Sequence, residues 1–276
     1  MANAKSGYFQ SGLPYHRFGH GSARLVVFQG MQFENRTLTG LPLWFLRRLY
    51  KPLEHDYTLY LTMRRPGLPG GYSLRDMSDD YAAMIRAEFG GPVDIIGLST
   101  GGLIAQHFAV EHPDLIRSLV IHSSAHRLGD EARDLHVRVG NLAREGQWTA
   151  AYAAVFDSMS PRHGMMRHVA KAAVRLASPF GGLLLGKPVD PSDMLVTYEA
   201  SNKHDFKDRL AEIKARTLVV AGDNDPFYTT TSFRETAEGI PNAKLILYRG
   251  IGHPASGKRF VQDVLSFLKE GTGEES

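Results

Sequence analysis

The sequence predicts an α/β protein whose sheet is mainly parallel and doubly wound, with a helical cap inserted into it. Short apolar runs without polar alternation predict strands that are covered on both faces. These runs are residues 25–28, 58–62, 93–96, 119–121, 217–221 and 243–248. Amphipathic patterns typical of helices alternate with the runs, at residues 79–89, 103–110 and 260–268. Strand and helix in alternation indicate a parallel sheet with helices on both sides.

The alternation stops in the middle of the chain. Residues 129–213 contain no convincing strand and are rich in helical patterns, at 131–145, 149–159, 165–176 and 193–204. We therefore expect residues 1–128 and 214–276 to form the core and residues 129–213 to form a cap, because such a long stretch in a compact sheet protein rarely serves packing alone. The alternative is that these helices belong to the main helical layer. Residues 8–18, punctuated by glycine and proline, predict an antiparallel hairpin before the first parallel strand.

Composition excludes several classes of protein. The 276 residues include no cysteine, which excludes disulfides, a thiol nucleophile and thiolate metal sites. The 32 basic residues nearly balance the 29 acidic ones, and no long basic run suggests a nucleic-acid partner. The N-terminal residues lack the apolar core of a signal peptide, and no apolar run is long enough to span a bilayer. We therefore expect a cytoplasmic protein without nucleic-acid or membrane partners; its oligomeric state stays open.

The strongest chemical signal is the segment Gly97-Leu-Ser99-Thr-Gly101, which lies between the apolar run 93–96 and the helical pattern 103–110. A serine at a tight strand-to-helix turn is lifted out of the sheet, and small residues two before and two after it let the backbones approach. The helix N-terminus beside it favours developing negative charge. We predict that Ser99 is a nucleophile and that Gly97 and Gly101 shape its turn. The alternative is an ordinary helix-capping serine.

A serine hydroxyl needs a base, and the base needs an orienting carboxylate. His253 follows the last predicted strand in a glycine-flanked loop, which makes it the candidate base. Two carboxylates, Asp223 and Asp225, follow the strand at 217–221. We prefer Asp225 because Pro226 fixes the backbone after it and Asp223 lies closer to the strand end; either could instead cap the next helix.

Other motifs are weaker. His122 and His126 are spaced like a metal pair, but no third ligand completes the pattern, so we interpret them as surface or supporting histidines and expect no metal. Residues 252–258 and 181–187 match the start of a phosphate-binding loop, but neither continues with the serine or threonine that would hold magnesium. We therefore expect neither nucleotide hydrolysis nor any cofactor.

With its nucleophile, acid and base in the order Ser99, Asp225, His253, the chain resembles the α/β-hydrolase family of serine hydrolases. Residues 64–73 resemble the family's glycine-rich turn, and residues 111–121 resemble its stretch after the nucleophile helix. The resemblance extends from the first parallel strand to the final helix. It implies the α/β-hydrolase fold.

One position departs from the family pattern. Many members carry His-Gly after the first parallel strand, whereas this chain has Gln29-Gly30-Met31 there. A backbone donor does not depend on the preceding side chain, so the resemblance still implies an oxyanion hole made by the N–H groups of Met31 and Thr100. The His-Gly pair at residues 20–21 precedes the strand and is not the equivalent.

The expected reaction is acyl transfer to water. Ser99 attacks a carbonyl, His253 accepts its proton and Asp225 orients the imidazole, so activity should fall below about pH 6 as the base becomes protonated. We expect a carboxylesterase for small apolar esters. Most apolar residues of the cap should only pack the cap against the core, and some of them should line an acyl pocket. They are Phe156, Met159, Met165, Met166, Phe180, Leu183, Leu184 and Leu185. The resemblance also allows a carbon–carbon bond hydrolase, a lactonase, a perhydrolase, or a signalling protein that binds a ligand with little turnover.

Overall fold

The computed structural model describes residues 4–158 and 190–270, which form one mainly parallel sheet with helices around it. The eight strands found there run in the order β1-β2-β4-β3-β5-β6-β7-β8. They are β1 Lys5–Tyr8, β2 Pro14–Gly19, β3 Ala23–Phe28, β4 Tyr57–Thr62, β5 Val93–Leu98, β6 Ile116–His122, β7 Arg216–Gly222 and β8 Ala243–Tyr248. β1 and β2 form the predicted antiparallel hairpin at one edge, and the pairs from β4 to β8 are parallel. This is the predicted α/β architecture.

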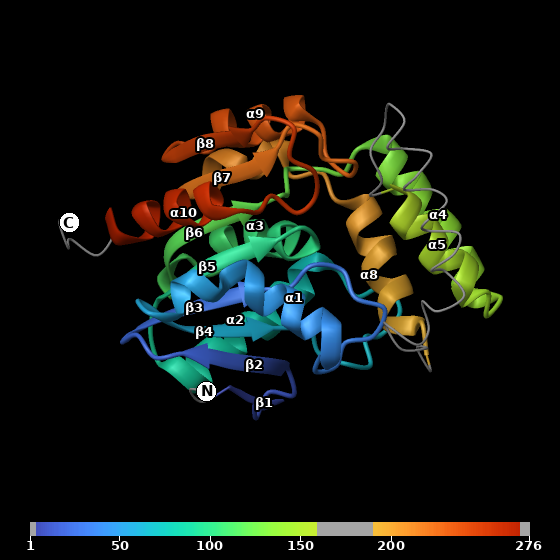
Figure 1. Cartoon of the computed structure of the whole chain (residues 1–276), viewed down its shortest axis with the longest axis horizontal. Coiled ribbons are helices and arrows are strands. Elements are labelled where there is room, and N and C mark those ends of the chain that lie inside the picture. The colour runs from blue at the N-terminus through green and yellow to red at the C-terminus, as the bar shows by residue number, and fades with distance from the viewer. Residues whose placement is uncertain (1–3, 159–189, 271–276) are drawn as a thin grey trace.

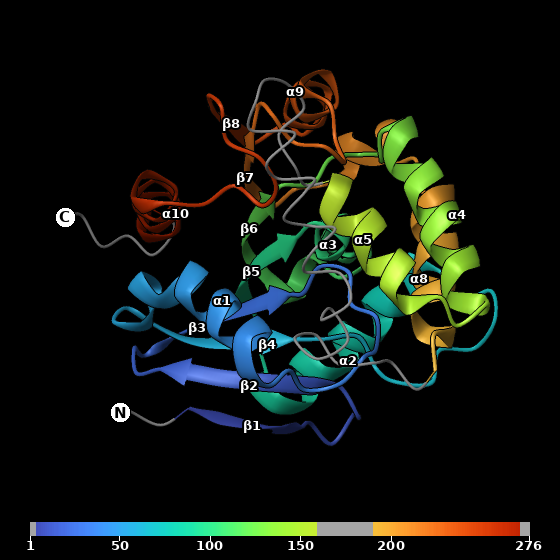
Figure 2. The same ribbon diagram turned by 45° about the vertical axis from the view of Figure 1, so that its right-hand side comes forward.

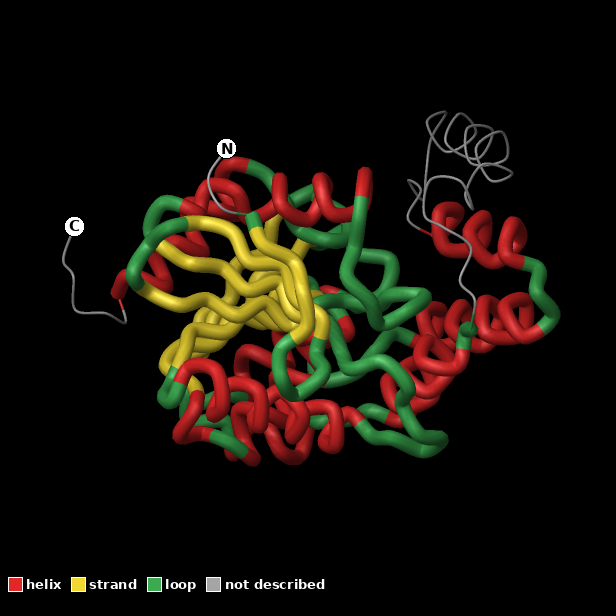
Figure 3. The backbone as a smooth tube through the Cα atoms, turned by 90° about the horizontal axis from the view of Figure 1, so that it is seen from below, coloured by secondary structure: helices red, strands yellow, loops and turns green. Residues whose placement is uncertain are grey.

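Helices cover both faces of the sheet, as Figure 3 shows. On one face lie α2 Leu74–Phe89, α3 Thr100–Glu111 and α9 Thr230–Gly239; on the other lie α1 Gly40–Tyr50 and α10 Lys258–Glu270. The short 3₁₀ turns η1 Lys51–Glu54 and η2 Pro113–Leu115 join α1 to β4 and α3 to β6, and η4 Lys207–Glu212 precedes β7. With both faces covered, all six residues of β5 are buried. This double coverage explains the continuous apolar runs in the sequence.

Among the described residues between β6 and β7, where the sequence predicts the cap, there are three helices. They are α4 Asp130–Arg144, α5 Trp148–Ser158 and α8 Ser192–Lys203, and they gather beside the sheet rather than on either face (Figure 1 and Figure 2). They bury a small apolar cluster of their own, which includes Val139, Ala151 and Met194. The helix predicted at 165–176 lies outside the described residues.

The carboxylate of Asp193 ties α8 to the core. Its two oxygens accept the backbone N–H groups of Gly67 (3.2 Å) and Leu68 (2.7 Å), which belong to the glycine-rich turn before α2. Two backbone donors on one buried carboxylate fix the start of α8 against the sheet. Within the part of the chain that is described, no helix is long and apolar enough to cross a membrane.

Candidate active site

Ser99 occupies the sharp turn between β5 and α3. Its backbone has φ 52° and ψ −120°, and only one other non-glycine residue in the described chain, Ser123, has a positive φ. Two backbone hydrogen bonds hold the turn: the N–H of Ser99 donates to the carbonyl of His122 (2.9 Å), and the N–H of Gly102 donates to the carbonyl of Ser99 (2.8 Å). Strained backbone of this kind persists only where its surroundings fix it, and it clusters at functional sites.

The two glycines of the motif are required by close packing. A Cβ on Gly101 would collide with the backbone carbonyl of Phe28, at the end of β3. A Cβ on Gly97 would lie 2.6 Å from the Cα of Gly102. Both contacts are closer than any side chain allows, so the turn forms only with hydrogen at these positions.

Asp225 and His253 are brought together, although 28 residues separate them. His253 Nδ1 lies 2.7 Å from Asp225 Oδ2, while Asp225 Oδ1 accepts the backbone N–H groups of Phe227 (2.8 Å) and Tyr228 (3.2 Å). Asp223 faces elsewhere and accepts the N–H of Gly250 (2.6 Å). Because a carboxylate only accepts, Nδ1 carries the hydrogen and the other ring nitrogen, Nε2, is the one available to act as a base.

The loop after His253 is anchored on the end of β6. His122 Nε2 lies 2.7 Å from the carbonyl of Ala255, and the N–H of Ala255 donates to Ser123 Oγ (2.8 Å). A carbonyl only accepts, so His122 donates from Nε2, and its Nδ1 accepts the hydroxyl of Tyr50 (3.0 Å). Burial lowers the pKa of His122 to about 3, which keeps the ring neutral and this pattern intact.

Of the two interpretations of His122 and His126, surface or supporting histidines, the structure favours the second, since both are buried. His122 supports the loop of His253, and His126 contacts Thr236 through its backbone N–H (2.8 Å) and its Nδ1 (3.2 Å). Among the described residues, no group of three His, Cys, Asp or Glu side chains is placed to hold a metal ion.

The backbone N–H groups of Met31 and Thr100 are the predicted donors of the oxyanion hole. Neither N–H donates to an acceptor in the described chain, and both residues line the same cavity as Ser99. The loop before Met31 is held by Arg64, whose buried guanidinium donates to the carbonyls of Gln29 (3.0 Å) and Gly30 (3.1 Å). Sequence reasoning missed this role of Arg64, because a charged residue in a glycine-rich turn is normally expected at the surface.

The cavity that contains Ser99 encloses about 990 Å³, part of it open to solvent. His253 lines it together with Ser99, and most of the other lining residues are apolar: Phe33, Phe45, Leu46, Leu98, Leu128, Leu135, Val155 and Phe227. Leu135 and Val155 come from α4 and α5. Phe156, which was predicted to line the pocket, is not among the lining residues, and the other predicted cap residues, from Met159 to Leu185, lie outside the described ranges.

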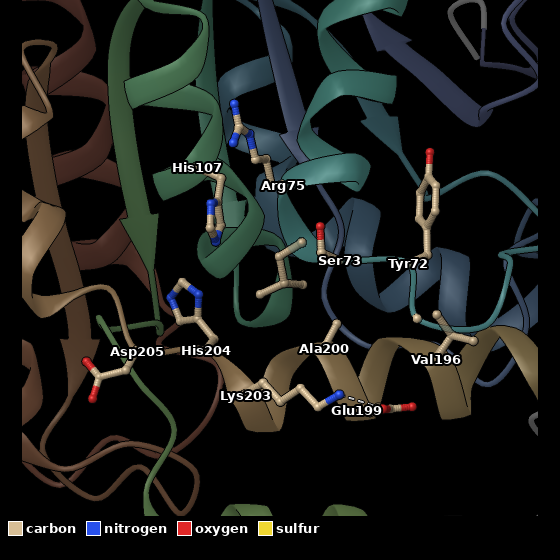
Figure 4. A pocket seen from close by; sticks show the side chains of 12 residues that line it. Tyr72, Ser73, Arg75, His107, Val196, Glu199, Ala200, Lys203, His204 and Asp205 are labelled. Carbon is tan, nitrogen blue, oxygen red and sulfur yellow. Dashed lines mark hydrogen bonds and ion pairs between the residues drawn. The ribbon is translucent and has the colours of Figure 1, made fainter.

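A second cavity of about 620 Å³ lies between the start of α2, α3 and α8 (Figure 4). Two histidines, His107 and His204, lie in it with ring centroids 5.3 Å apart. Lys203 on the same wall pairs with Glu199 (2.6 Å), and Arg75 pairs with Glu111 (3.1 Å). None of the predicted nucleophile, base or acid residues lines this cavity.

The chain is similar to known hydrolases along most of its length. The family model described as "Alpha/beta hydrolase family" matches residues 38–262. A protein of Pseudomonas savastanoi pv. phaseolicola named as a carbamate hydrolase, RutD, is 27% identical over 263 residues, which cover 93% of this chain and 98% of that protein.

Two solved structures share the fold. The enol-lactonase of Burkholderia xenovorans LB400 has a TM-score of 0.74 at 19% identity, over 96% of this chain and 100% of its own. A thermophilic esterase of Thermogutta terrifontis has a TM-score of 0.73 at 18% identity, over 98% of this chain and 99% of its own.

Proposed function

This chain belongs to the alpha/beta hydrolase family, and on that premise we propose that it is a serine hydrolase that cleaves carboxylic esters through an acyl-enzyme on Ser99. The observation that carries the proposal is the 2.7 Å pair of His253 and Asp225, which shares a cavity with the strained Ser99. An imidazole oriented by a buried carboxylate, in the same cavity as a hydroxyl on a sharp turn, is the arrangement that activates serine.

The proposed reaction has two steps. Ser99 Oγ attacks the ester carbonyl while His253 Nε2 accepts its proton, and Asp225 stabilises the imidazolium that forms. The N–H groups of Met31 and Thr100 stabilise the oxyanion, the alcohol leaves with the proton from His253, and water then releases the acid by the same sequence. The substrate we propose is a small apolar ester, because the walls of the cavity are mostly apolar.

We further propose that residues 129–213 act as a cap over this cavity. Support comes from Leu135, Val155 and Tyr198, which belong to α4, α5 and α8 and line the cavity together with Ser99. Helices that supply pocket walls but share no face of the sheet are suited to select the substrate rather than to stabilise the core.

The direct test is labelling with a fluorophosphonate probe, followed by mass spectrometry of the modified peptide. We expect the probe on Ser99 in the wild-type protein and in Ser118→Ala, which removes a buried serine hydroxyl of β6 outside the site. No labelling is expected in Ser99→Ala. Modification of another residue, or of none, would contradict the proposed nucleophile.

A panel of p-nitrophenyl esters of increasing acyl length then tests turnover. Rapid hydrolysis supports an esterase. Labelling of Ser99 without measurable turnover, together with tight binding of an apolar ligand, would instead favour a ligand-binding role. A carbamate ester belongs in the panel as the second candidate substrate, because the relative from P. savastanoi is named for carbamate hydrolysis and spans nearly the whole chain.

A further inference from the structure

A third cavity lies next to the active-site cavity, on the other side of the loop that carries His253. It holds about 1390 Å³, including open solvent, between α1 and the start of α10, which cover the same face of the sheet (Figure 2). Phe45 of α1 lines both cavities. The loop that carries His253 also contributes to both cavities. His253 and Pro254 line the active-site cavity, and Ser256, Gly257 and Lys258 line the third cavity.

The charged residues that line this third cavity are all cationic. Three cationic side chains line it, from Arg48, Lys51 and Lys258, and no acidic residue does. In the described chain none of the three forms an ion pair; Arg48 lies over the ring of Trp44 at 5.5 Å. Cations close together without carboxylates attract an anion, and they raise its local concentration.

Other cationic side chains on this face of the sheet form ion pairs, unlike the three that line the cavity. Arg47 pairs with Glu54 (2.9 Å), Lys269 with Asp56 (2.8 Å) and Arg259 with Asp263 (3.8 Å). The carboxylates nearby are therefore engaged by cations outside the cavity. The positive charge within the cavity is left for a ligand.

Apart from Ser256 and Gln262, the other side chains that line the cavity are apolar. Leu49 and Pro52 follow from α1 into η1, and Val261 and Leu265 face them from α10. A wall that combines apolar side chains with unpaired cations fits a molecule with an apolar chain and an anionic end.

We propose that this cavity binds the anionic end of the substrate, a carboxylate or a phosphate joined by an apolar arm to the ester that reacts at Ser99. The inference rests on the proposed esterase function and narrows its substrates to amphipathic anionic esters. Phe45, at the border of the two cavities, marks the path of the arm.

The kinetic test compares each anionic ester with a matched neutral one. Monomethyl esters of dicarboxylic acids of increasing length are compared with their dimethyl esters, and an acylglycerol phosphate with the matching monoacylglycerol. For at least one anion type we expect a KM about tenfold lower than for its neutral match, and this advantage should shrink with added sodium chloride. The two series separate a carboxylate from a phosphate as the preferred end.

The variant Arg48→Gln/Lys51→Gln/Lys258→Gln should raise KM about tenfold for the anionic ester and leave that for the neutral ester within about twofold. Arg259→Gln is the matched control, since it removes a cation next to Lys258 that does not line the cavity. Equal KM values for anionic and neutral esters in the wild type would overturn the proposal. So would an unchanged preference in the triple variant, or the same loss in Arg259→Gln.

A binding measurement keeps this inference separate from the esterase proposal. Calorimetry with dodecanoate and dodecanol on Ser99→Ala needs no turnover, and we expect dodecanoate to bind about tenfold more tightly than dodecanol, with that gap lost when the three cations are also removed. If no ester is hydrolysed but this result holds, the esterase proposal fails and the anion site stands. If dodecanoate and dodecanol bind alike, the anion site is wrong whatever the enzyme hydrolyses.

Discussion

The Ser99 cavity and the cavity of His107 and His204 both contain histidine, yet their chemistry differs. In the first, His253 lies 2.7 Å from a carboxylate that two backbone N–H groups also hold. In the second, His107 Nδ1 and His204 Nε2 are buried without any hydrogen-bond partner in the described chain. A histidine beside a cavity becomes a base only when a second group fixes its tautomer and stabilises its cation.

The surroundings of the second pair work against charge. Burial lowers the pKa of His107 to about 4, with nearby Arg209 as a further cause. Burial also lowers the pKa of His204, and the neighbouring His107 adds to the effect. Both rings are thus neutral. His107 meets the Phe206 ring edge-on, at a centroid distance of 4.7 Å, and His204 stacks on it at 5.6 Å. The comparison indicates that His107 and His204 serve packing at the C-terminal end of α8 and do not transfer protons.

The largest effect that would test this contrast is the loss of the nucleophile. Ser99→Ala should lower kcat for a p-nitrophenyl ester by a factor on the order of 10⁴ to 10⁶, because no other group forms the acyl-enzyme. Circular dichroism should show an unchanged fold, and Ser118→Ala should keep wild-type activity. Activity near wild type in Ser99→Ala would remove Ser99 from the mechanism.

The second-largest effect is expected from the loss of the carboxylate that orients His253. Asp225→Asn should lower kcat by a factor on the order of 10³ to 10⁴, since an amide in that place favours the wrong tautomer of His253. Asp223→Asn is its matched control, because Asp223 binds the N–H of Gly250 and not the histidine. We expect it to lose less than about tenfold. The reverse order of the two losses would reassign the acid.

A smaller effect is expected from the second cavity. His107→Gln should change kcat/KM by less than about threefold, with a loss of about 1 kcal/mol in the free energy of unfolding. His253→Gln, made in parallel, should lose nearly all activity. A large loss of kcat in His107→Gln without loss of stability would show that the two cavities are not as different as their hydrogen bonds indicate.

The smallest effect concerns pH. His107 titrates at about 4 when folded and near 6.5 when unfolded, so between these values the unfolded chain holds the extra proton and stability falls as pH falls. Each such histidine contributes a slope of about 1.4 kcal/mol per pH unit in that window. Urea unfolding should show a shallower slope for His107→Gln below pH 6.5 and a constant offset from wild type above it. Identical slopes would contradict the buried neutral ring.

The sequence predicts correctly those segments whose residue pattern is compatible with a single local structure. The run into Ser99 and the two glycines around it allow only the strand, sharp turn and helix that the structure has. The choice of Asp225 over Asp223 rested on a slight difference in position. The 2.7 Å contact with His253 now favours the same choice.

In the two helices that the sequence did not predict, the apolar face toward the sheet is hard to recognise. α1 packs Leu43, Leu46 and Leu49 against the core. It also exposes Trp44 and Phe45 to solvent, so its apolar residues do not mark a single face. α9 buries little besides Phe233 and two hydroxyl side chains, Ser232 and Thr236. Arg64 was missed, and the choice between a surface and a supporting role for His122 stayed open, for a related reason: their burial depends on backbone carbonyls contributed by distant segments.

His122 has one consequence for motion in this molecule. Its carbonyl accepts the N–H of Ser99, and its ring donates to Ala255, two residues beyond His253. A single residue at the tip of β6 is thus bonded to the segments that carry both reacting groups. We therefore expect a displacement of His122 to move both segments together.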